Sequence, residues 1–137
     1  LVGAGLLFCG ATLFSMGCGR LFEGTPAQML ASLDRLAQLP ADTLVCAGHE
    51  YTAANGRFAS TVEPANADLA RRLRDVASLR ESSRPTLPIP LGNELACPPF
   101  LRVDTAGVVD WARRQGSGED RVARFAALRR AKDDFRA

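Results

Sequence analysis

Apolar residues gather in short runs along the first third of the chain, and farther on they recur at helical spacing. The runs LLFCG (6–10) and TLVCAG (43–48) are short and apolar, and each predicts a buried strand. The opening stretch LVGAGLLF (1–8) also predicts a buried strand, because it is too short to cross a bilayer and lacks the basic region of a signal peptide. Several glycines in ATLFSMGCGRLFEG (11–24) indicate a loop whose backbone bends tightly or closely approaches another group.

Residues 25–39, TPAQMLASLDRLAQL, predict a helix with a well-defined start. Thr25 is a suitable N-cap, Pro26 suits the first helical position, and Gln28 completes a capping box. Pro40 ends the helix. Strand, glycine loop, helix and strand in this order predict an α/β fold.

The second half of the chain has helical periodicity. From Asn66 the apolar residues fall three or four positions apart, and two further helices are predicted over 105–115 and 119–134. Residues 85–99 lie between the helix that starts near Asn66 and the helix over 105–115. They hold five of the chain's eight prolines, which predicts an extended connection. Core positions are assigned in both halves: Met29, Leu33, Leu36, Leu69, Leu73 and Trp111.

Composition excludes wholesale disorder and gives little support to a charged macromolecular partner. The chain is 47% hydrophobic and 23% charged, so we expect a packed core. A net charge of +2 is too small to indicate nucleic acid or a membrane surface, and we expect neither partner. The four cysteines form no CxxC pair, which is typical of reduced thiols in a cytoplasmic protein.

His49 is the only histidine of the chain, and it follows the predicted strand 43–48. The loops at the carboxyl ends of strands are where α/β sheets usually bind ligands. Imidazole is a common zinc ligand, but zinc requires three or four donors and no second histidine is present. From the residues alone, a structural role for His49 and a ligand role both remain open.

Several motifs, in order, resemble those of the hydroxyacylglutathione hydrolases, or glyoxalase II, of the metallo-β-lactamase superfamily. They are LLFCGATLFSMGCGRLFEGT, LVCAGHEYTAANGRFASTVEP, RPTLPIPLGNELACPPFLR and LRRAKDDF. The resemblance implies the C-terminal part of such an enzyme. Residues 1–64 would form the second part of an αβ/βα sandwich, and residues 65–137 a helical glutathione-binding domain. The implied reaction is hydrolysis of S-(2-hydroxyacyl)glutathione, typically S-D-lactoylglutathione, to glutathione and D-lactate, the second step of methylglyoxal detoxification.

The resemblance also implies two divalent metal ions, zinc by expectation, that share a bridging hydroxide. His49 matches the family's final histidine ligand, in GHEYT. The family's THxHxDH motif is absent, and Ala11 stands where the family has a bridging aspartate in GDTLFS. Because a methyl group cannot bridge two cations, we predict a weakened or mononuclear site and assign no catalytic side chain to this chain.

Four residues match the positions with which the family binds the glycine carboxylate of glutathione. These are Arg20, Tyr51, Arg129 and Lys132. The last two stand three residues apart, so on a helix they share one face and can converge on one carboxylate. Phe22 replaces a tyrosine of some relatives, which removes a hydroxyl contact. Glu50 and Asp133 are candidates for orienting neighbouring groups, with surface roles equally open.

Two alternatives accompany the hydrolase interpretation. The substitution at Ala11 and the absent ligands favour a non-catalytic module that binds glutathione conjugates. The arginine-rich C-terminal part would suit a helical domain that binds a polyanion. For the hydrolase we expect a cytoplasmic protein that is a monomer when full length.

Overall fold

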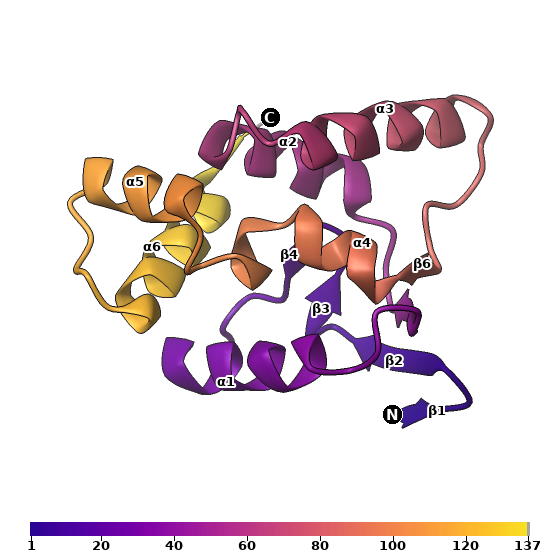
Figure 1. Cartoon of the computed structure of the whole chain (residues 1–137), viewed down its shortest axis with the longest axis horizontal. Coiled ribbons are helices and arrows are strands. Elements are labelled where there is room, and N and C mark those ends of the chain that lie inside the picture. Colours follow the sequence, from indigo (N-terminus) through magenta and orange to yellow (C-terminus); the bar gives the residue numbers. More distant parts are fainter. Residues whose placement is uncertain (137) are drawn as a thin grey trace.

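The computed structural model describes residues 1–136 and has a mixed α/β architecture (Figure 1). A four-stranded sheet has the order β1-β2-β5-β6. Its central strands, β2 (Leu6–Gly10) and β5 (Leu44–Ala47), are parallel to each other. They correspond to the two apolar runs that predicted strands. The edge strands β1 (Val2–Gly3) and β6 (Ile89–Pro90) pair antiparallel with β2 and β5.

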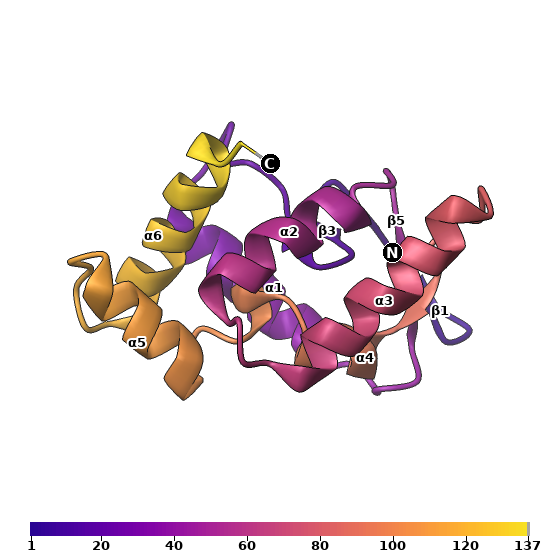
Figure 2. The ribbon, with the colours of Figure 1, turned by 90° about the horizontal axis from the view of Figure 1, so that it is seen from above.

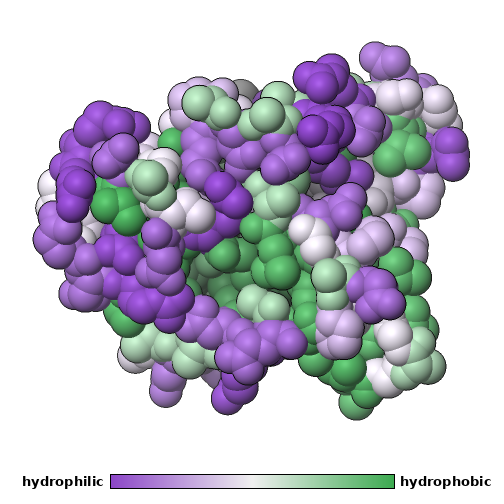
Figure 3. Space-filling model, in the orientation of Figure 1, coloured by the Kyte–Doolittle hydropathy of each residue, from purple (hydrophilic) through white to green (hydrophobic). Residues whose placement is uncertain are grey.

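Only one face of the N-terminal hairpin is buried. Leu7 of β2 is 1% exposed, whereas Phe8 is 53% exposed because successive side chains of a strand point to opposite faces. Leu1 and Val2 are 95% and 57% exposed, so the prediction of a buried strand is wrong for the opening residues. Apolar side chains accordingly gather at the surface over β1 and β2 (Figure 3).

The glycine-containing stretch that follows β2 is a hairpin and not only a loop. Strands β3 (Leu13–Phe14) and β4 (Gly17–Cys18) pair antiparallel, and the turn between them places Met16 at φ 57°. The close approach predicted from the glycines is present at Gly19, where an added Cβ would lie 2.1 Å from the carbonyl oxygen of Ala11.

Helix α1 (Pro26–Ala37) is the helix that the capping signals predict. The Thr25 hydroxyl accepts from the Gln28 amide at 3.2 Å, and the Gln28 side chain accepts from the Thr25 amide at 2.9 Å. Leu33 is fully buried, and the other two predicted core positions, Met29 and Leu36, pack against the core while partly buried.

Two helices follow β5. Helix α2 (Thr52–Val62) was not predicted, whereas α3 (Ala67–Glu81) begins where the helical pattern was predicted to begin, with Asn66 as its N-cap. Viewed from above, α2 lies between α6 on one side and α3 on the other (Figure 2). Leu69 and Trp111 are buried as assigned, and Leu73 is partly buried against the core.

The proline-rich stretch is more regular than an extended connection. It contains β6, the six-residue helix α4 (Leu91–Ala96) and the 3₁₀ turn η1 (Pro99–Leu101). The prediction fails because prolines flank α4 without entering it, so its backbone hydrogen bonds survive.

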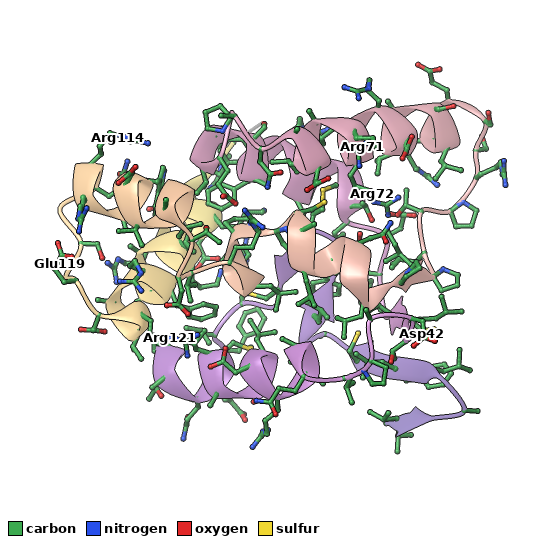
Figure 4. All side chains as sticks on the ribbon, viewed as in Figure 1. Asp42, Arg71, Arg72, Arg114, Glu119 and Arg121 are labelled. Atoms are coloured by element: carbon green, nitrogen blue, oxygen red, sulfur yellow. The ribbon has the colours of Figure 1, made fainter. Side chains whose placement is uncertain are left out.

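The last two helices, α5 (Ala106–Arg114) and α6 (Arg121–Asp134), confirm the predicted pair. Gly116, at φ 71°, separates them. Arg121 joins the start of α6 to α1, since its Nη1 lies 2.6 Å from the Asp34 carboxylate (Figure 4).

One large apolar cluster draws side chains from nearly the whole chain. It includes Leu7, Leu33, Phe58, Phe125 and Leu128. The division at residue 64 and the αβ/βα sandwich therefore stay predictions. The four cysteines are free thiols, and among residues 1–136 no helix is both long and apolar enough to cross a membrane.

Candidate functional site

Two loops meet where the parallel strands β2 and β5 end. Gly10 is the register partner of Ala47, and the amide of Gly48 donates to the carbonyl of Gly10 at 2.9 Å. The hydrogen bond ties the turn that carries Ala11 to the loop that carries His49. The strand topology therefore brings the two positions that the resemblance assigned to a metal centre to one edge of the sheet.

The His49 ring is exposed and is held by aromatic neighbours. It stacks on Tyr51, with ring centroids 5.1 Å apart and an interplanar angle of 3°. Phe14 meets both rings edge-on, with centroids 5.0 Å from Tyr51 and 6.1 Å from His49. Because the ring is exposed, His49 remains accessible to a ligand, as a histidine buried in the core would not.

Glu50 anchors the same loop to the backbone before β6. Its carboxylate accepts from the Thr86 amide at 2.6 Å and from the Thr86 hydroxyl at 2.7 Å. Burial raises the pKa of Glu50, but the hydrogen bonds from Thr86 and Thr52 outweigh this effect and lower the pKa overall. Glu50 thus contacts threonines, and no hydrogen bond joins it to the imidazole in the described part of the chain.

Arg129 projects from α6 into the interior and holds the loop after β4. It is 5% exposed, and its Nη1 donates to the carbonyls of Cys18 at 2.7 Å and Gly19 at 3.3 Å. Its Nε and Nη2 face the Asp133 carboxylate at 3.1 and 2.9 Å, and its guanidinium lies 5.2 Å from the Phe100 ring centroid. Most of its donors are therefore satisfied by the chain itself.

Lys132 is the third basic residue of this group and lies on the same helix as Arg129. Within residues 1–136 its ammonium makes no hydrogen bond or ion pair, and the side chain is half-buried. Burial lowers the pKa of Lys132, and the positive charges of Arg129 and Arg20 lower it further. Arg20 is 61% exposed and lies 3.7 Å from Asp133. An anion placed here would relieve the mutual repulsion of the three cations.

These elements enclose a cavity of about 520 Å³. Glu50 and Asp133 do not line it, whereas Ala11 and all five residues that the sequence predicted as ligands do: Arg20, His49, Tyr51, Arg129 and Lys132. Phe14, Ala54 and Asn55 also line it and were missed, the last two because α2 was not predicted. Their roles as ligands stay predictions, but the cavity is where each would act.

The chemistry of the lining favours anion binding and does not favour covalent catalysis by this chain. Burial raises the pKa of the Cys18 thiol to about 11, so the sulfur is protonated and a poor nucleophile at neutral pH. No group of three or more His, Cys, Asp or Glu side chains able to hold a metal occurs among residues 1–136. The residues present do not fit a zinc centre on their own, since His49 is a single donor and Ala11 offers none.

Comparisons with known proteins identify the family of the chain. Residues 50–135 match the family model "Hydroxyacylglutathione hydrolase C-terminus". The chain is 55% identical over 138 residues to the hydroxyacylglutathione hydrolase of Xanthomonas campestris pv. campestris (strain B100), covering 99% of the chain and 54% of that protein. It is 56% identical to the hydroxyacylglutathione hydrolase of Cupriavidus metallidurans, covering 99% of the chain and 52% of that protein.

The chain thus spans about half the length of the curated relatives it matches. The matched region includes α6, which carries Arg129 and Lys132, and the loop residue Tyr51. By family model and by sequence, this chain belongs to the hydroxyacylglutathione hydrolases.

Proposed function

We propose that the chain is the part of an S-(2-hydroxyacyl)glutathione hydrolase that anchors the glutathione moiety of the thioester. The observation that carries this proposal is the convergence of Arg20, Tyr51 and Lys132 on one cavity that His49 also lines. The names of the relatives supply the substrate class, and the cavity supplies cations suited to its carboxylates.

Lys132 is the primary anion contact in this proposal, because its ammonium forms no hydrogen bond or ion pair within residues 1–136. Arg20 would approach the same carboxylate from the loop after β4, and the Tyr51 hydroxyl would donate a hydrogen bond from the opposite side. Charge-assisted hydrogen bonds to a carboxylate are the stronger kind, so a half-buried lysine contributes more than an exposed one.

Hydrolysis of the thioester would require donors from outside this chain. His49 would supply one imidazole beside the reacting carbonyl, and any zinc centre would need its other ligands from elsewhere. The alternative function, binding of glutathione conjugates without hydrolysis, is favoured by one observation. Ala11 stands beside the His49 loop, and its side chain has no oxygen with which to bind a metal.

The Lys132→Ala variant tests the anchoring role. We expect the dissociation constant for glutathione, measured by titration calorimetry, to rise about tenfold or more, the loss typical of one charge-assisted hydrogen bond. Arg130→Ala is the matched control, because Arg130 is exposed on the same helix and outside the cavity. Equal affinities for the wild type and Lys132→Ala would reject the proposal.

Because hydrolysis would need donors from outside this chain, turnover of S-D-lactoylglutathione is measured with a full-length protein that contains it, carrying alanine or aspartate at position 11. Turnover with alanine at position 11 supports the hydrolase, whereas lysine-dependent binding without turnover supports the binding module.

A further inference from the structure

We propose that Asp133 is a positioning residue that aligns Arg129 and Arg20 around Lys132. The proposal rests on the anion-anchoring function above and adds a residue that would not itself touch the ligand. An aspartate beside a site for anions is unexpected on charge alone, because it repels the ligand.

Asp133 is placed to orient both arginines. Its Oδ1 lies 3.1 Å from Nε and 2.9 Å from Nη2 of Arg129, one helical turn earlier. The same oxygen lies 3.7 Å from Nε of Arg20, which comes from the loop after β4. The carboxylate therefore joins α6 to the loop through two arginines that line the cavity.

The pair also fixes the backbone of that loop. With Nε and Nη2 of Arg129 directed at Asp133, its Nη1 faces the carbonyls of Cys18 and Gly19. These residues directly precede Arg20. The direction in which Arg20 leaves the loop thus depends on Arg129, and the side-chain angle of Arg129 depends on Asp133. Within residues 1–136, Lys132, the neighbour of Asp133 in sequence, has no hydrogen-bond or ion-pair partner and can meet the anion.

Charge and position predict opposite results when Asp133 is removed. If Asp133 acted only through its charge, its loss would leave a more positive cavity, and an anion would bind more tightly. If Asp133 positions the arginines, its loss would weaken binding, because the freed guanidinium groups no longer converge. The sign of the change in affinity therefore distinguishes the two.

The experiment compares Asp133→Ala with Asp134→Ala by titration calorimetry with glutathione. Both changes remove one negative charge from the end of α6, but Asp134 is exposed and makes no hydrogen bond or ion pair within residues 1–136. We expect Asp133→Ala to weaken binding by about tenfold, the lower range for loss of a residue that orients a ligand-binding group. Asp134→Ala should leave binding unchanged or slightly tighter.

Tighter or unchanged binding by Asp133→Ala would overturn the proposal. If that variant does not fold, as judged by circular dichroism, Asp133→Ser replaces it, because its short side chain cannot reach both arginines, and the same sign of the change decides. The Lys132→Ala result separates the positioning role from the anchoring function. If Lys132→Ala loses affinity and Asp133→Ala does not, only the positioning role is rejected. No loss in Lys132→Ala rejects the anchoring function itself.

Discussion

Glu94 on α4 shows how a single buried carboxylate supports the hairpin that leads to the site. It is 1% exposed and accepts from the Ser15 hydroxyl at 2.6 Å and from the Met16 amide at 2.8 Å. Both partners lie in the turn between β3 and β4, which leads to the loop held by Arg129. Burial raises the pKa of Glu94, although the hydrogen bonds from Ser15 and Met16 and the charge of Arg72 oppose this effect.

The raised pKa of Glu94 gives a stability prediction with a definite sign. From pH about 4.3, where an exposed glutamate titrates, up through the raised pKa, the folded protein binds more protons at this site than the unfolded chain. The contribution of Glu94 to the free energy of unfolding therefore decreases as pH rises. Glu94→Gln retains an acceptor for Met16 and cannot ionise, so its stability relative to the wild type should increase across this window.

Urea unfolding of both proteins at a series of pH values measures this difference. A difference that stays constant with pH would show that Glu94 does not change its protonation there.

The sequence indicated which residues line the site better than it indicated how those residues are buried and paired. A resemblance placed Arg129 at a substrate position, and the structure places it against the cavity. Its burial and its bonds to Cys18 and Gly19 could not be predicted, because they join positions more than 100 residues apart. The spacing of Arg129 and Lys132 defines a helix face, but not which side chain is already paired.

At the scale of elements, α1 depends on a cap that can be tested directly. Thr25→Ala removes the acceptor for the Gln28 amide and should lower the free energy of unfolding by about 1 kcal/mol. Thr25→Ser keeps the hydroxyl and should remain close to the wild type. Thermal or urea unfolding of the two variants checks this, and equal stabilities would mean that the capping box contributes nothing.

The elements that were missed lack such local signals. Helix α2 begins at a Tyr51 cap that makes no side-chain hydrogen bond, and it contains the poor helix formers Asn55 and Gly56. Tertiary packing explains the glycine, because a Cβ at Gly56 would lie 2.4 Å from Leu73 and 2.8 Å from Met16. Helix α2 forms because it packs between its neighbours. The residues that determine this packing are distributed over distant parts of the sequence, so the local sequence does not predict the helix.

At the scale of the molecule, the position of α6 against the rest of the chain determines whether the site exists. Two basic residues of the cavity, Arg129 and Lys132, lie on α6, while His49 and Tyr51 follow β5. Aromatic packing links these parts, since Phe100 lies 6.0 Å from Phe58 and 5.9 Å from Phe125 between ring centroids. Ion pairs of Arg121 with Asp34 and Asp104 add a polar connection at the surface.

A shared core predicts that the two parts of the chain unfold together. Trp111, the only tryptophan, reports on α5 by fluorescence, whereas Leu33 lies in α1 and is fully buried in the same cluster. Leu33→Ala should lower the free energy of unfolding by about 2–5 kcal/mol, and the Trp111 transition should move by the full amount. Gln38→Ala, exposed at the end of α1, serves as the control and should shift neither signal.

Urea unfolding followed by Trp111 fluorescence and by far-ultraviolet circular dichroism makes the measurement. Coincident curves that move together would mean that α6 is held in place by the packing that holds the sheet, so the anion-binding cations and the His49 loop form and disappear as one unit. A Trp111 transition unmoved by Leu33→Ala would instead show that α5 and α6 fold independently. The cavity would then open without unfolding of the sheet, and glutathione affinity would depend on docking between two separate parts.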